Sequence, residues 1–136
     1  MNMQPITSGQ GQASFREIAL PEQADHRGAL HGARALQMMG RAALACAARH
    51  AGGPVVMAKA DAIEFARPVP AGARVDVRAR IVFQGRSSMT VTVEIAPAPT
   101  AAPAITGRFM MVAVDGDGRP VPIPVPDQRS AEELRP

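Results

Sequence analysis

The chain of 136 residues lacks most of the residue types that mark a specialised chemistry. It has one cysteine, no tryptophan, no tyrosine and four phenylalanines. A single cysteine excludes an intramolecular disulfide framework and a zinc site built from two or four cysteines. No run approaches the roughly 18 apolar residues of a membrane-spanning helix, and the first residues lack the basic start and apolar run of a secretory signal. We therefore expect a soluble, cytoplasmic protein with no membrane partner.

The charge is positive but not concentrated. The net charge is +3, and Lys59 is the only lysine, so the positive charge comes almost entirely from scattered arginines. No aromatic residues are interleaved with them for base stacking. These features disfavour nucleic acid as a partner and are compatible with a small anionic ligand.

Hydrophobic periodicity predicts one long helix and a set of antiparallel strands. Residues 31–50 are rich in Ala, Leu and Met, and the helix is stopped by Gly52, Gly53 and Pro54. Apolar and polar residues alternate over 75–83 and again over 89–95, on either side of a turn that contains glycine, as in a hairpin. Further strands are expected at 14–20, 55–65 and 105–114, and residues 120–126 read as an extended, polyproline-like surface segment.

This order of elements predicts an α+β domain in which one long helix packs on a five-stranded antiparallel sheet. The domain is expected to span residues 14–124, between a flexible N-terminus (1–13) and a flexible C-terminal tail (125–136). An open sheet has two edges, and pairing one edge strand with its own copy would give a dimer.

Several polar groups have simpler interpretations than a functional site. Asp115-Gly116-Asp117-Gly118 begins like a calcium loop, but no ligand pattern follows it, so a turn is expected. The set Asp25, His26 and His31 lacks metal-ligand spacing, and no metal site is predicted. Cys46 lies in the middle of the helix and is expected to be a small buried residue and not a nucleophile.

The informative segment is the loop 25–33, which leads into the helix. A turn with Gly28 and Gly32 at a helix start leaves backbone N–H groups free beside the positive end of the helix dipole. Such a site can bind an anion or polarise a carbonyl. The alternative is an ordinary tight turn.

From about Phe15 to Pro124 the chain resembles the hotdog-fold acyl-CoA thioesterases of the acyl-CoA hydrolase type. The resemblance rests on five segments in the same order and spacing. They are His26-Arg27-Gly28 with His31-Gly32; Ala48-Arg49-His50-Ala51-Gly52-Gly53; Ala60-Asp61-Ala62-Ile63-Glu64-Phe65 with Arg67-Pro68-Val69; Gly85-Arg86-Ser87-Ser88-Met89; and Phe109-Met110-Met111-Val112-Ala113-Val114-Asp115 with Gly118-Arg119-Pro120-Val121-Pro122.

The resemblance implies a central helix wrapped by the sheet, a homodimer or trimer of dimers, and sites at the dimer interface. It implies that backbone N–H groups at Gly28, Gly32 and Ala33 hold the thioester carbonyl and that a side chain activates water. Coenzyme A is part of the substrate, and no separate cofactor is implied. Arg86, Ser87 and Ser88 on the hairpin turn suit a CoA phosphate, although a solvated turn is the alternative.

The chain departs from the family pattern at the residues that carry out the chemistry. The second glycine of the usual pair is Ala33, the usual helix acid is Gly40, and the polar position after Gly28 is Ala29. Three residues remain as replacement candidates: Gln37, three residues before Gly40; Asp61, on the following strand; and His31, at the helix start. Each has a structural alternative: Asp61 as an ion-pair partner of Lys59 or an arginine, and His31 as a helix cap.

These departures leave three hypotheses. The first is an acyl-CoA thioesterase-like protein that hydrolyses fatty acyl-CoA to the free acid and CoA, slowly because position 40 is glycine. The second is a non-catalytic protein that binds acyl-CoA or pairs with another subunit. The third is a dehydratase-type hotdog enzyme, for which His31 and Asp61 are the only candidate pair.

Overall fold

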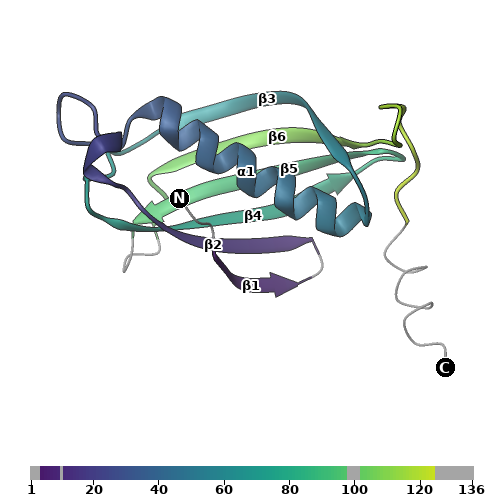
Figure 1. The fold of residues 1–136 in the computed structure, drawn as a ribbon, viewed down its shortest axis with the longest axis horizontal. Helices are drawn as coiled ribbons and strands as arrows, with labels where there is room; N and C mark the ends of the chain where they lie inside the picture. Colours follow the sequence, from purple (N-terminus) through teal and green to yellow (C-terminus); the bar gives the residue numbers. More distant parts are fainter. Residues whose placement is uncertain (1–3, 10, 98–101, 125–136) are drawn as a thin grey trace.

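The computed structural model describes residues 4–9, 11–97 and 102–124, with side chains from residue 11 onward. Six strands form one antiparallel sheet in the order β1-β2-β4-β5-β6-β3. A single long helix, α1, lies across one face of this sheet (Figure 1). The elements are β1 (Gln4–Gly9), β2 (Gln12–Ile18), the short 3-10 helix η1 (Pro21–Gln23), α1 (Gly32–Ala51), β3 (Val55–Phe65), β4 (Arg74–Gln84), β5 (Ser88–Pro97) and β6 (Ile105–Ala113).

The core lies between α1 and the inner face of the sheet. The apolar residues of the alternating strands are buried there, including Val75 and Val77 of β4 and Val91 and Val93 of β5. From the helix, Met38 and Met39 are fully buried together with four alanines. Because alanine adds little bulk, the helix backbone can lie close to the strands. The prediction of one helix packed on an antiparallel sheet is confirmed.

The helix ends where the sequence predicts. Gly52 adopts a left-handed conformation (φ 75°) and donates its N–H to the carbonyl of Ala48. This conformation costs little for glycine and closes the last turn. Strand β3 then returns along the helix and forms one edge of the sheet, opposite β1 (Figure 1).

Two segments differ from the sequence-based expectations. Residues 4–9 form β1, paired antiparallel with β2, so the sheet has a sixth strand within the segment expected to be flexible. The segment after β6 is not a simple surface strand, because Ile123 is buried. Proline at every second position leaves the N–H groups of Val121 and Ile123 on one side, and these donate to the carbonyls of Ala113 and Arg86. The expected flexible tail, residues 125–136, lies outside the described residues.

Candidate active site

Asp25 organises the loop that precedes the helix. Its Oδ1 accepts hydrogen bonds from the backbone N–H groups of Arg27 (2.8 Å) and Ala29 (3.1 Å). These two bonds lower the pKa of the Asp25 carboxyl below its usual range. Gly28 takes the left-handed conformation (φ 78°) that the turn requires. The sequence correctly marks a tight turn here, but the N–H of Gly28 is already donated to the carbonyl of Asp25.

His31 caps the helix. Its Nδ1 accepts a hydrogen bond from the backbone N–H of Ala33 (3.2 Å), which satisfies one of the free donors of the first turn. The proton of the neutral ring is therefore on Nε2. His31 thus adopts the structural role that the sequence left open as an alternative. In this arrangement its ring offers a hydrogen-bond donor to the surroundings, whereas the basic nitrogen is occupied.

A hollow of about 290 Å³ lies beside this first turn. It brings His31 and Ala33 together with Gln37, one turn further along the helix, so three of the predicted site residues share one cavity. The N–H of Gly32 donates to no other residue in the described part of the chain. Residues that the sequence did not single out complete the wall: Glu22, Gln23, Ala24 and Arg34.

Gly40 faces the edge strand β3 and not the hollow. A Cβ built at Gly40 would lie 3.4 Å from the Met57 Cε, the mobile end of a flexible side chain. A Cβ at Gly32 would lie 3.5 Å from the ring of Phe65, at the other end of β3. Large apolar side chains of α1 and β3 are 40–51% exposed: Leu36 and Leu44 of the helix, and Val56, Met57 and Phe65 of the strand. We call these five residues the β3 edge patch.

Asp61 is separated from the hollow. It lies on β3, where its carboxylate is 3.1 Å from Arg108 Nε and 3.4 Å from Lys59 Nζ. The hydrogen bond from Arg108 lowers the pKa of Asp61. The ion-pair role that the sequence offered as the alternative is thus the one observed. Within one chain the structure does not bring Asp61 into the cavity of His31, which leaves the dehydratase pair without support.

The predicted phosphate-binding turn, residues 86–88, lies at the opposite end of α1. It joins β4 to β5, and β4 is tied to the last turn of the helix because Gln84 Oε1 lies 2.7 Å from His50 Nε2. A helix of 20 residues is about 30 Å long, so this turn is far from His31 in the same chain. The sequence places both segments in one site, but a single chain does not.

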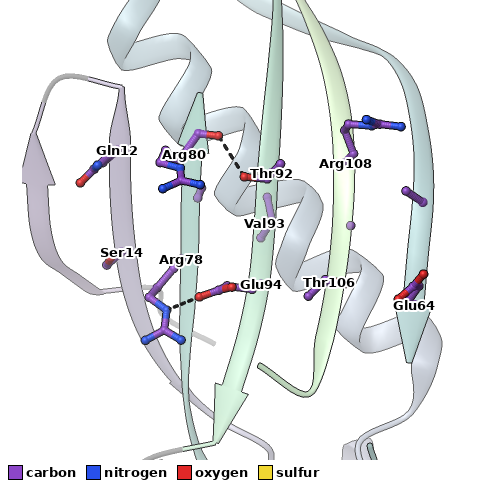
Figure 2. A pocket seen from close by; sticks show the side chains of 13 residues that line it. Gln12, Ser14, Glu64, Arg78, Arg80, Thr92, Val93, Glu94, Thr106 and Arg108 are labelled. Atoms are coloured by element: carbon purple, nitrogen blue, oxygen red, sulfur yellow. Dashed lines mark hydrogen bonds and ion pairs between the residues drawn. The ribbon is translucent and has the colours of Figure 1, made fainter. Parts of the chain in front are cut away.

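A second hollow, of about 550 Å³, is on the sheet face turned away from the helix (Figure 2). Polar side chains from five strands line it. Arg78 of β4 donates to Glu94 of β5 at 2.7 Å, and Thr92 donates weakly to the carbonyl of Arg80 at 3.5 Å. The alternation of each strand predicts that these side chains point away from the core, because each is next to a buried residue in the sequence. The sequence does not predict which of them lie beside one another across the strands. Larger volume does not make this hollow the reaction site, because no backbone donors of a helix end open into it.

No cluster of three His, Cys, Asp or Glu side chains suited to a metal ion occurs in the described residues. Cys46 is buried, and its burial raises the pKa of the thiol to about 11. A thiol with this pKa is not a nucleophile at neutral pH. Among the helices described, none is long and apolar enough to cross a membrane.

One α-helix on an antiparallel sheet, with an open first turn at the sheet edge, is the architecture of the hotdog thioesterases. The family model described as "Thioesterase superfamily" matches residues 27–102, more than half of the chain, and the chain belongs to this family. It is 36% identical over 116 residues to an uncharacterized acyl-CoA thioester hydrolase of Zymomonas mobilis; the match covers 82% of this chain and 77% of that protein.

Two solved structures show the same fold. The hexameric thioesterase of Yersinia pestis is 29% identical with a TM-score of 0.75, covering 81% of this chain and 93% of that chain. The acyl-CoA hydrolase of Staphylococcus aureus, solved with butyryl coenzyme A, is 23% identical with a TM-score of 0.80, covering 92% of this chain and 79% of that chain. The predicted family resemblance and fold class are confirmed by these matches.

Proposed function

We propose that this protein hydrolyses the thioester of a fatty acyl-CoA to the free acid and CoA. Family membership together with the hollow at the start of α1 carries the proposal. The N–H of Gly32 donates to none of the described residues, and together with the positive end of the helix dipole it forms a site for a thioester oxygen that gains negative charge as water attacks. No cofactor other than the CoA of the substrate is part of the proposal, and we place the reaction in the cytoplasm.

The rate is expected to be low. The helix acid usual in the family is replaced by Gly40, and the exposed Gln37, three residues earlier in the helix, carries a neutral amide. An amide orients water or a carbonyl but does not accept a proton at neutral pH. A positioned base contributes about 10²–10⁴-fold, whereas helix-start donors alone contribute about 10²–10³-fold.

A second copy of the chain would complete the site. Strand β3 is one of the two edge strands of the described sheet and is eleven residues long, and the β3 edge patch exposes large apolar side chains. An exposed edge of this kind favours pairing with its own copy, about a two-fold axis. Antiparallel pairing of β3 with β3 sets the Val55 end of one strand against the Phe65 end of the other.

This pairing would join the two separated halves of the site. Val55 is paired with Ala113, whose N–H donates to the carbonyl of Ser87 (2.8 Å), so the 86–88 turn lies near the first residue of β3. Phe65 lies against Gly32 at the helix start. Arg86 and Ser87 of one chain would therefore approach the helix start of its partner, where a guanidinium and hydroxyls suit the phosphates of CoA. We propose a homodimer as the functional unit and a trimer of dimers as the larger assembly.

Release of free CoA from a panel of acyl-CoAs, from acetyl to palmitoyl, tests the proposal with a thiol reporter. We expect slow, saturable hydrolysis that is lost when Gly32→Pro removes the backbone donor. Matched samples of Gly53→Pro, at the far end of the helix, control for a general effect of proline. An absence of CoA release above background for every chain length contradicts the proposal.

The second candidate is a non-catalytic dimer that binds acyl-CoA. Gly40 and Ala29 favour this function, because neither residue has the polar side chain that is usual in the family at its position. Tight binding of a non-hydrolysable thioether analogue without turnover of the thioester would support this function over hydrolysis.

A further inference from the structure

Glu17 is a buried carboxylate that the proposed chemistry does not use. It occupies a core-facing position of β2, in the same alternating row as the buried residues Ala13 and Phe15. Its side chain has no exposed surface, and neither carboxylate oxygen accepts a hydrogen bond from the described residues. A buried charge without hydrogen bonds is costly and requires an explanation. Its burial raises the pKa, against the opposing effect of the nearby Arg34.

Arg34 links this carboxylate to the hollow at the helix start. One terminal nitrogen of its guanidinium, Nη2, lies 3.9 Å from Glu17 Oε1. The other, Nη1, donates to Gln37 Oε1 at 2.5 Å. The Arg34 side chain is only 15% exposed, so it is held between the two partners and not free in solvent. A planar guanidinium can serve two partners at once in fixed directions, which an ammonium cannot.

The consequence for Gln37 is a defined orientation of its amide. Since the amide oxygen accepts from Arg34, the amide nitrogen and its two hydrogens point away from Arg34. Gln37 lines the hollow together with His31. On the side away from Arg34, the group that Gln37 offers to a ligand is thus an N–H donor. Glu17 itself does not line the hollow, which excludes it as the group that touches the substrate.

We propose that Glu17 is a positioning residue: through the guanidinium of Arg34 it fixes the Gln37 amide so that its NH₂ group donates into the hollow at the start of α1. This inference rests on the proposed function, because the donated hydrogen bond supports the thioester carbonyl next to the Gly32 N–H. No proton moves along the chain of contacts. Gln37 then acts as a donor that polarises the carbonyl and does not supply the missing general base.

A double-mutant cycle measures this coupling. Glu17→Gln keeps the size of the side chain but removes its charge, and we expect kcat to fall about tenfold with KM nearly unchanged, because an amide displaced by about 1 Å loses its alignment. In the Gln37→Ala background the same change should have no further effect. A purely structural role for Glu17 predicts equal losses in both backgrounds, and that result would overturn the proposal.

Two further variants serve as controls for the effect of Glu17→Gln. Glu94→Gln removes the acid of another Arg–Glu pair, on the outer sheet face, and should leave kcat unchanged. Arg34→Lys keeps the positive charge beside Glu17 but cannot hold both partners, so it should reproduce the loss seen in Glu17→Gln. If Glu17→Gln does not fold, Arg34→Lys tests the same link from the other side, and full activity of that variant contradicts the proposal.

A readout without turnover separates this inference from the proposed function. The side-chain NH₂ signals of Gln37, assigned by their loss in Gln37→Ala, should shift or broaden in Glu17→Gln and stay in place in Glu94→Gln. If these signals change as expected but the protein hydrolyses no thioester, the proposed function is contradicted and the positioning role of Glu17 is supported. If the Gln37 signals are unchanged in an active Glu17→Gln enzyme, the positioning role is contradicted and the proposed function is supported.

Discussion

The two ends of α1 differ in what lies beside them. At the C-terminal end, His50 is buried and hydrogen-bonded to Gln84, whose amide nitrogen donates to the carbonyl of Pro124. At the N-terminal end, a hollow opens beside His31, and the N–H of Gly32 has no partner in the described chain. One end is closed by the segment after β6, whereas the other is open to a ligand. Within one chain, the proposed donors to the thioester thus lie at the open end of the helix, and the packing of Ile123 lies at the covered end.

The largest expected effect comes from restoring the family's helix acid at position 40, on the side of α1 that faces β3. Gly40→Asp should raise kcat for acyl-CoA hydrolysis by about 10²-fold or more, because a positioned carboxylate supplies the missing general base. The structure accommodates the change, since the new Cβ meets only the flexible end of Met57. Steady-state kinetics measures it.

Gly40→Asn is the matched control, because it adds the same volume without a base and should not raise kcat. A wild-type rate that is already high and unaffected by Gly40→Asp would mean that the native chain has its base elsewhere, and would return Gln37, Asp61 and His31 to consideration.

Ile123→Ala tests the closed end. Truncation of a buried isoleucine should lower the free energy of unfolding by about 2–4 kcal/mol through lost burial and a residual cavity. Denaturant unfolding of the variant and of Val82→Ala, a truncation at a half-exposed position of β4, gives the comparison. Equal losses in the two variants would contradict the assignment of Ile123 to the core.

His31→Ala should have a smaller effect on stability. Loss of the cap leaves the N–H of Ala33 without its acceptor and is expected to cost about 1 kcal/mol. His26→Ala, which alters an exposed histidine of the same loop, should cost almost nothing. Thermal unfolding distinguishes the two; a cost for His26→Ala as large as for His31→Ala would rule out a specific capping role.

The smallest effect is expected from Asp25→Asn, and it depends on pH. Because the pKa of Asp25 is lower in the folded protein, its charged form stabilises the fold, fully so above the pKa of the unfolded chain. This stabilisation is lost as the pH falls through the folded-state pKa. Asparagine can keep the turn, so the stability gap between wild type and Asp25→Asn should be widest at neutral pH and close in acid. A gap that widens in acid would reverse the assigned sign.

Much of the fold could be predicted because local signals agreed with the tertiary structure. The alternation over 75–83 and 89–95 matches β4 and β5, and Gly52 ends the helix as expected. Three features could not be read from local patterns. Residues 4–9 lack apolar alternation but form a strand, the alternating prolines hide the burial of Ile123, and the charge of Glu17 suggests an exposed residue although its strand register points inward.

The candidate site was predictable only in part. The turn chemistry of Gly28 and the helix start at Gly32 identify the open first turn. The sequence does not show that the 86–88 turn is a helix length away, since that separation depends on the direction of β3 and β4 in the sheet. Nor does it reveal Arg34 as a bridge. Its hydrogen bond to Gln37 is local, three residues along the same helix, but its contact with Glu17 of β2 depends on tertiary packing.

Complementation between two impaired variants tests most directly whether the site spans two copies of the chain. Gly32→Pro damages the helix start and Arg86→Glu damages the phosphate-binding turn, so each homodimer should be impaired. In a refolded equal mixture, a shared site predicts that heterodimers regain one intact site, with recovery of up to about a quarter of wild-type activity. Activity that stays at the level of the separate variants, although heterodimers have formed, would contradict a site built from two chains.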